Sequence, residues 1–148
     1  MADIRPMTYE DVDGVWSIEE ESFNVPWTKK DFQNEMAENK MAVYFVAEED
    51  GRIVGYAGMW HIVNEGHITN VAVSEEFRNR GIGKQLMEAL FEECRKREMI
   101  GITLEVGVNN LTAQKLYKGL GFEEEGVRKN YYEHNHEDAL IMWKYFNY

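Results

Sequence analysis

The stretch from Asn70 to Lys84 constrains the possible folds of this chain more than any other segment. It begins with apolar residues typical of a buried strand, continues through a polar turn, and ends with two glycines that open a long helix. The first backbone N–H groups of a helix lack partners within the helix and carry a partial positive charge. Because Gly81 and Gly83 have no Cβ, an anion such as a phosphate can approach the backbone closely there. The positively charged side chains around this helix start are Arg78, Arg80 and Lys84.

Two common phosphate-binding loops are excluded by residue spacing. A P-loop would need glycine at position 78 and serine or threonine at position 85, where the chain has Arg78 and Gln85. The dinucleotide-binding fingerprint would need a third glycine at the position of Leu86. The remaining pattern, Arg-x-x-Gly-x-Gly, is compatible with a phosphate site and equally with an ordinary helix start that has charged flanks.

Composition restricts the class of protein. The 148 residues suffice for one domain with a hydrophobic core, and residues 1–148 are expected to form a single domain. The net charge of −11 argues against general nucleic-acid binding and would suit a basic substrate. No apolar run is long enough for a membrane span, and no secretory signal is visible. The single cysteine, Cys94, excludes an internal disulfide and fits a reducing cytoplasm.

Hydrophobic periodicity predicts seven strands and four helices. Thr8 is expected to cap the first helix, and Thr28-x-x-Asp31 resembles a capping box at the start of the second. Strands are expected at residues 3–6, 41–47, 53–60, 67–73, 102–106, 122–132 and 139–146. Helices are expected at residues 8–20, 28–36, 81–98 and 110–120.

The connections between these elements predict their pairing. Short turns at residues 48–51 and 64–66 join three consecutive antiparallel strands. The strand–helix–strand unit at residues 67–106 should place its two strands parallel, with a right-handed crossover. The last two strands should be antiparallel around a polar loop. The expected fold class is therefore α/β, a mixed α+β arrangement in one domain.

Two blocks of sequence resemble the acetyl-CoA motifs of the Gcn5-related N-acetyltransferase (GNAT) family. The first is VAV at 71–73 followed by RxxGxG at 78–83. The second contains LEV at 104–106, NN at 109–110 and AxxLYxxLGF at 113–122, at the expected distance from the first. The resemblance covers nearly the whole chain. It implies a single GNAT-like domain, with about seven strands in a mixed, centrally splayed sheet flanked by four helices.

Further residues resemble the RimI-type subgroup of that family, which acetylates the N-terminal alanine of a small-subunit ribosomal protein. They are PWT at 26–28, RxNYY at 128–132 and EDAxxM at 137–142. The resemblance implies a cytoplasmic acyltransferase that uses acetyl-CoA and binds the N-terminus of a ribosomal protein, without direct contact to nucleic acid or membrane. One departure is Gly107, where relatives often carry arginine, and this change bears on which peptides are preferred.

The resemblance also implies which residues hold acetyl-CoA. The pyrophosphate would lie on the backbone of residues 79–84, in agreement with the argument from the helix start. The pantetheine arm would pair like an extra strand with residues 71–73, which requires the strands of Val73 and Glu105 to splay apart. The backbone N–H of Val73 then becomes a candidate oxyanion donor. The implied cofactor-binding residues are Val71, Ala72, Val73, Arg78, Asn79, Arg80, Gly81, Ile82, Gly83, Lys84, Asn110 and Tyr117.

Two residues are implied as catalytic. Glu105 is the candidate general base, and its position within an apolar strand needs a reason because a buried carboxylate is costly. The alternative is that it faces solvent or pairs with a nearby cation. Tyr117 is the candidate general acid for the departing thiolate, and periodicity equally places its ring in the core beside Leu116 and Leu120.

The remaining candidates concern the substrate, the cofactor and metals. Subgroup similarity places three aromatic side chains in the acceptor channel, although each could simply close the surface: Trp27, Tyr131 and Tyr132. Asn110 could bind the cofactor or cap its helix. The pair His134 and His136 is too few ligands for a metal site, so no metal is expected.

Two other functions stay open at this stage. The same fold could acetylate a lysine side chain, a polyamine or another small amine, and lysine would demand more of the base because its pKa is about 10.4. The chain could also be an acyl-CoA sensor without catalysis. The presence of both Glu105 and Tyr117 at matching positions argues against the sensor.

Overall fold

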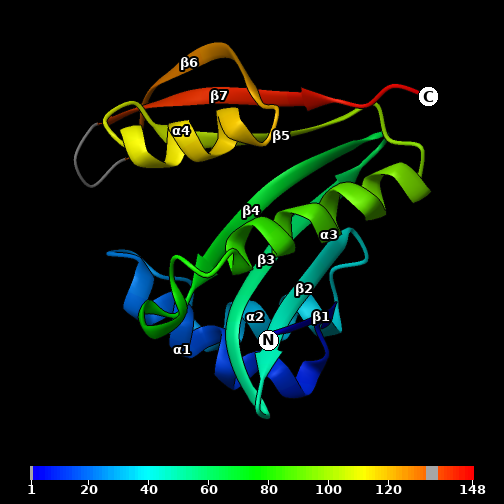
Figure 1. The fold of residues 1–148 in the computed structure, drawn as a ribbon, viewed down its shortest axis with the longest axis vertical. Coiled ribbons are helices and arrows are strands. Elements are labelled where there is room, and N and C mark those ends of the chain that lie inside the picture. Colours follow the sequence, from blue (N-terminus) through cyan, green and yellow to red (C-terminus); the bar gives the residue numbers. More distant parts are fainter. Residues whose placement is uncertain (1, 133–136) are drawn as a thin grey trace.

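The structure is a computed structural model that describes residues 2–132 and 137–148. Within these residues, seven strands form one sheet in the order β1-β2-β3-β4-β5-β7-β6 (Figure 1). The strands are β1 (Asp3–Pro6), β2 (Ala42–Glu49), β3 (Arg52–Ile62), β4 (Glu65–Val73), β5 (Gly101–Gly107), β6 (Glu123–Tyr132) and β7 (Glu137–Tyr145). The helices are α1 (Val12–Ser22), α2 (Lys29–Ala37), α3 (Ile82–Lys96) and α4 (Leu111–Gly119), with 3-10 turns η1 (Tyr9–Asp11) and η2 (Glu75–Phe77).

The strand pairing confirms the predicted mixed sheet. Strands β1 to β4 are antiparallel to their neighbours, β4 and β5 are parallel, and β7 is antiparallel to both β5 and β6. The main local difference is at the first helix, which was expected to begin at Thr8. The chain first forms the 3-10 turn η1, closed by a 3.0 Å bond from the Asp11 N–H to the Thr8 carbonyl. Asp11 also pairs with Arg5 at 2.7 Å, which holds this turn against β1.

Two hydrophobic cores lie on opposite faces of the sheet. Helix α3 packs on one face, and α4 joins it through Ala113, Tyr117 and Leu120; we call this core the α3-side core. Helices α1 and α2 pack on the other face through Val15, Ile18 and other residues of the α1/α2-side core. The alternation along β2 produces both cores, because successive side chains of a strand point to opposite faces. Members of the two cores on β2 alternate strictly: Val43, Tyr44, Phe45, Val46 and Ala47.

The sheet opens between its two central strands. β4 pairs with β5 only at the start of both strands, from Glu65 to His67 opposite Gly101 to Thr103. Beyond these pairs the two strands separate, as Figure 1 shows. The central splay expected from the resemblance is therefore confirmed. The later residues of β4 and β5 enclose a gap, which we call the central gap.

A β-bulge in β4 accompanies this opening. Thr69 is the extra residue, since Ile68 pairs with Met59 and Asn70 pairs with Gly58. The bulge makes Thr69 and Asn70 face the same side of the sheet, toward α1 and α2. A bulge bends and twists its strand, which turns the end of β4 away from β5.

Candidate functional site

The backbone of β4 presents free hydrogen-bonding groups to the central gap. The N–H of Ser74 donates to the Val54 carbonyl of β3 at 2.8 Å. Because N–H groups of successive strand residues point in opposite directions, those of Val71 and Val73 point away from β3 and into the gap. Ala72 bonds back to β3, and its side chain is buried in the α1/α2-side core. An extended chain could therefore pair with Val71 and Val73 as an additional strand.

The start of α3 forms a concave backbone surface. Gly81 is the N-cap in a left-handed conformation with φ of +80°, and Asn79 also has a positive φ of 65°. The first helical bond runs from the Gln85 N–H to the Gly81 carbonyl at 3.0 Å. The three preceding N–H groups, of residues 82 to 84, therefore have no partner within the helix. A Cβ on Gly81 would meet no atom within 4 Å, so an anion has room to approach.

The three cations expected around this helix start take different positions. Arg78 donates from Nε to the Val73 carbonyl at 3.1 Å, so it lies at the end of β4 and the central gap. The Arg80 guanidinium stacks over Phe77 at 4.9 Å, and Lys84 is exposed. Ile82 is buried in the α3-side core, so it can serve a ligand only through its backbone. The backbone N–H groups and Lys84 thus surround the helix start directly, while Arg78 and Arg80 contact neighbouring groups.

Glu105 faces the side of the sheet that carries α1 and α2. Its strand neighbours Leu104 and Val106 are buried in the α3-side core, so alternation directs Glu105 to the opposite face. Its side chain is 26% exposed, and Oε1 lies 3.6 Å from Arg128 Nη1 on β6. Glu105 therefore does lie near a cation, Arg128, which was the alternative to a role as general base. The carboxylate nevertheless remains accessible beside the central gap, where a general base would be needed.

Tyr131 and Tyr132 of β6 lie in the same cluster as Glu105. The two rings are 5.0 Å apart, and the Arg128 guanidinium lies 4.9 Å over the ring of Tyr131. Burial, with a contribution from the negative charge of Glu105, raises the pKa of Tyr131. Burial raises the pKa of Tyr132 to about 12, and neighbouring Tyr131, Glu137 and Glu105 add to the effect. Both phenols are therefore neutral near pH 7 and can donate hydrogen bonds to an acceptor polypeptide.

Tyr117 approaches from the opposite face of the sheet. Its ring packs on Phe122 at 5.7 Å, as periodicity predicted. Its hydroxyl forms no hydrogen bond with residues 2–132 or 137–148. Burial raises the pKa of Tyr117 above its ordinary value, so the phenol is protonated at neutral pH. Asn110 caps α4, since its side-chain oxygen accepts from the Ala113 N–H at 3.1 Å, and its amide nitrogen takes no part in that cap.

Gly107 leaves space for a carboxylate. A Cβ at this position would collide with Glu137 Oε2, which accepts a hydrogen bond from the Asn109 N–H at 3.0 Å. The Glu137 carboxylate thus fills the space that a side chain at position 107, such as the arginine often carried by relatives, would enter. It adds a negative charge on the face that carries Glu105.

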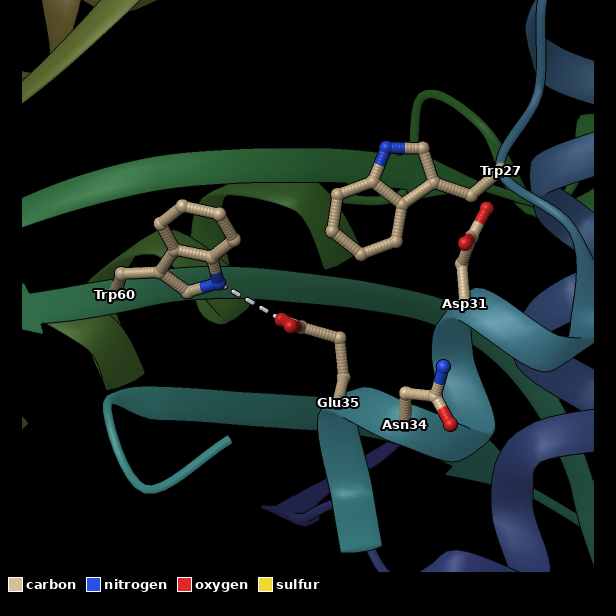
Figure 2. A pocket seen from close by; sticks show the side chains of 5 residues that line it. All are labelled: Trp27, Asp31, Asn34, Glu35 and Trp60. Carbon is tan, nitrogen blue, oxygen red and sulfur yellow. Dashed lines mark hydrogen bonds between the residues drawn. The ribbon is translucent and has the colours of Figure 1, made fainter. Parts of the chain in front are cut away.

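Trp27 lies on the loop between α1 and α2 and lines a pocket of about 310 Å³ (Figure 2). The backbone N–H of Trp27 donates to Glu19 at 2.9 Å. Glu19 is 2% exposed and also accepts from Asn70 at 3.0 Å and from Tyr56. Glu19 therefore links the loop that carries Trp27 to the bulge of β4. The sequence analysis did not select this residue, nor Glu35 and Trp60 of the pocket. A glutamate on a helix rich in charged residues is expected to be exposed.

The described residues contain no group of three or more histidine, cysteine, aspartate or glutamate side chains that could hold a metal ion. His134 and His136 lie outside the described residues. No helix within residues 2–132 and 137–148 has the length and hydrophobicity to cross a membrane. Cys94 is fully buried in the α3-side core.

Comparison with known proteins identifies the class. The acetyltransferase (GNAT) family model matches residues 12–122. A likeness in fold extends to the PaiA N-acetyltransferase of Thermoplasma acidophilum in complex with coenzyme A, with a TM-score of 0.84 and 18% identity over 99% of both chains. The chain therefore belongs to the GNAT family of acetyltransferases.

More similar relatives carry a narrower name. A Bacillus subtilis strain 168 protein, 44% identical over 99% of this chain and 97% of its own, is provisionally named ribosomal protein bS18-alanine N-acetyltransferase. A Salmonella typhimurium protein with the same name is 34% identical over 96% of both chains. The crystal structure of the ribosomal-protein-S18-alanine N-acetyltransferase from Escherichia coli matches with a TM-score of 0.91 and 30% identity, covering 100% of this chain and 96% of that one.

Proposed function

We propose that this protein transfers an acetyl group from acetyl-CoA to the N-terminal alanine of ribosomal protein bS18. The observation that carries the proposal is the central gap. It exposes the backbone of Val71 and Val73 at the end of β4 and has Glu105 on β5 across from them. Named relatives at 44% and 34% identity support the choice of acceptor. A ribosomal protein as acceptor also supports a cytoplasmic location.

The residues present fit acetyl-CoA. The unpaired N–H groups at the start of α3, with open space at Gly81, suit a pyrophosphate. The backbone of Val71 and Val73 suits the amide groups of the pantetheine arm. Acetyl-CoA supplies an acetyl group activated as a thioester. Val71 and Val73 pack their side chains in the α3-side core, so the cofactor would lie against the α3 face while the acceptor enters from the α1/α2 face.

Glu105 is positioned to take a proton from the acceptor amine. An N-terminal amine has a pKa near 8, so a sizeable minority is already neutral at pH 7. The carboxylate therefore needs only to accept one proton, directly or through a water molecule, as the amine attacks. Tyr131 and Tyr132 lie beside Glu105 and would line the path of the acceptor.

Val73 and Tyr117 would stabilise the negative charges that develop on the thioester as the amine attacks. The Val73 N–H points into the gap and can donate to the oxygen that becomes negatively charged during attack. The Tyr117 phenol, held protonated by its burial, can give its proton to the departing thiolate. Asn110, whose amide nitrogen lies outside the helix cap, is a further candidate contact for the cofactor.

A panel of acceptors tests the proposal. The protein would be incubated with acetyl-CoA and peptides that begin with alanine, serine or methionine, an N-blocked lysine peptide, and spermidine, with products analysed by mass spectrometry. We expect one acetyl group on the α-amine of the alanine peptide. Acetylation of lysine or spermidine alone would contradict the assigned acceptor while keeping the acetyltransferase. Bound acetyl-CoA without any product would support a sensor instead.

A further inference from the structure

The pocket beside Trp27 combines aromatic walls with negative charge. It lies between α2 and β3 and is lined by Trp27, Asp31, Asn34, Glu35 and Trp60. Figure 2 shows the two indoles on opposite sides, the carboxylate of Glu35 between them, and Asp31, one turn earlier on α2, beside Trp27. The volume of about 310 Å³ lies at the lower end of the range for ligand sites and can hold a single long side chain.

Glu35 is buried without a compensating cation. It is 8% exposed and accepts hydrogen bonds at 2.8 Å from three neutral groups: the Tyr44 hydroxyl, the Trp60 indole and the Asn39 amide. No lysine, arginine or histidine among residues 2–132 and 137–148 forms an ion pair with Glu35 or Asp31. Three donors stabilise a buried carboxylate but leave its charge in place. The pocket is therefore a concave, negatively charged site with room for a cation.

We propose that this pocket binds the guanidinium group of an arginine in the acceptor polypeptide, downstream of the acetylated residue. The inference deepens the proposed function and rests on it. A guanidinium stacks on an indole face and donates from a planar fork to carboxylates, so it matches both features of the lining. A lysine ammonium is a compact, strongly hydrated charge and matches them less well.

The pocket lies on the face of the sheet from which the acceptor would reach Glu105. Trp60 pairs with His67 of β4, and His67 pairs with Thr103 of β5, two residues before Glu105. Strands lie about 4.8 Å apart and rise about 3.3 Å per residue, so the path from Trp60 to Glu105 is on the order of 10–15 Å. An extended polypeptide advances roughly 3.3–3.6 Å per residue. A side chain at position 2, 3 or 4 of the acceptor would reach the pocket.

Hydrogen bonds hold the pocket and the central gap in one framework. The hydroxyl of Tyr44 donates to Glu35 and lies 3.0 Å from Thr69 Oγ1, at the bulge of β4. The ring of Tyr44 lies across Gly58, where any Cβ would overlap it. The carboxylate of Glu35 is thus fixed relative to the strand that borders the gap, as a specificity site requires.

The charge of the molecule agrees with a basic acceptor. The net charge is −11, and Glu137, beside Gly107, contributes a carboxylate on the acceptor face. Ribosomal proteins bind RNA through lysine and arginine, so a ribosomal N-terminus offers basic side chains near the acetylated residue.

The first test compares arginine with citrulline, its uncharged isostere. Alanine-initiated peptides would carry one or the other at position 2, 3 or 4, and kcat/KM would be measured for each. We expect a preference for arginine of about tenfold at one position and at most about twofold at the others. An equal preference at every position, or none at any position, would overturn the proposal.

Variants then assign the preference to the pocket. Glu35→Gln removes the negative charge and should reduce the arginine preference, taken as the ratio of kcat/KM for the arginine and citrulline peptides with the same variant, to below about threefold. Glu38→Gln removes the same charge from an exposed site three residues away and should keep the full preference. Should Glu35→Gln not fold, Asp31→Asn serves as the second variant, because its amide oxygen can still cap the Thr28 N–H. A preference that survives both pocket variants would contradict the assignment.

A binding measurement separates the pocket from the enzymatic function. Without acetyl-CoA, Nα-acetyl-arginine methylamide would be titrated while the four indole N–H signals are followed by NMR. We expect the signals of Trp27 and Trp60 to shift and those of Trp16 and Trp143 to stay, with no shift for the citrulline analogue. If no alanine peptide were acetylated, the proposed function would fail while this titration still decided the pocket. Equal shifts with both compounds would refute the pocket.

Discussion

Glu105 is a carboxylate whose strand neighbours are apolar, and this contrast makes it visible in the sequence. In the structure it is half-buried, 3.6 Å from Arg128, and beside the central gap. The cation at this distance leaves the carboxylate uncovered, which suits a general base. Glu19 and Glu35 are more deeply buried, yet nothing in the sequence distinguishes them from exposed helical glutamates. Their roles depend on tyrosines and tryptophans that approach from other elements.

The first prediction concerns Glu105→Gln. The change removes the proton acceptor and keeps the size of the side chain, so kcat should fall about 10²- to 10⁴-fold. Acetyl-CoA affinity, measured by calorimetry, should stay within about twofold, since the proposed cofactor site lies on the other face. Glu88→Gln, an exposed position on α3, is the matched control. Undiminished turnover in the Glu105 variant would remove this residue from the mechanism.

The second prediction concerns Tyr117→Phe. Loss of the hydroxyl removes the proton donor, and kcat should fall about 10²-fold or more. The ring stays packed on Phe122, and the hydroxyl has no partner among the described residues, so the melting temperature should change little. The combination of lost turnover and retained stability distinguishes an acid from a core aromatic. A variant with normal turnover would leave Tyr117 with a packing role alone.

At the scale of elements, helices and strands follow from periodicity, whereas the bulge in β4 does not. The predicted strand 67–73 and helix 81–98 agree with β4 and α3 to within about two residues. The bulge at Thr69 instead depends on contacts distant in sequence, since Tyr44 contacts Thr69 and Glu19 holds Asn70. The strand–helix–strand pattern at residues 67–106 therefore predicts that β4 lies beside β5. The family resemblance was needed to predict that the two strands separate.

The two glycines at the start of α3 are predicted to differ. Gly81 has φ of +80°, where a side chain costs about 1–2 kcal/mol, so Gly81→Ala should lower stability by that amount and weaken acetyl-CoA binding. Gly83 has ordinary helical backbone, and its Cβ would meet Val73 Cγ2 at a normal 3.8 Å. Gly83→Ala should therefore retain stability. Urea unfolding and calorimetric titration of both variants test this, and equal losses in the two would refute the structural distinction.

In the whole molecule, the α3-side core keeps the single thiol of the chain neutral. Burial raises the pKa of Cys94 from 9.0 to about 12 in the α3-side core. The folded protein thus keeps the thiol proton at pH values where the unfolded chain has lost it. The stability that the protonated thiol gives to the folded protein is fully present below pH 9. It is lost as the pH rises toward about 12.

A pH series of urea unfolding measures this effect. Between pH 9 and 11 the free energy of unfolding should fall by about 1.4 kcal/mol per pH unit from this thiol alone. Cys94→Ala should be less stable at pH 8 because it leaves a small cavity, yet its stability should decline less steeply above pH 9. Parallel declines for both proteins would show that Cys94 does not titrate between the two states.

Two short turns and one crossover made the order of β2 to β5 predictable, whereas the position of β7 between β5 and β6 did not follow from any local pattern. The acceptor face was not predictable in the same way. It brings together the loop of Trp27, the helix of Glu35 and the strand of Glu105, and no local pattern reports that these three segments share one face. The arginine pocket and the acetyl-transfer site are products of that assembly.

We propose that an N-terminal amine is acetylated at the gap between β4 and β5, with Glu105 as the base. The most direct measurement uses one peptide that contains both an N-terminal alanine and an internal lysine, with the acetyl group located by tandem mass spectrometry. We expect the wild-type protein to acetylate the α-amine alone, and Glu105→Gln to acetylate it hardly at all. Acetylation of the lysine, or full α-amine acetylation by the Glu105 variant, would contradict it.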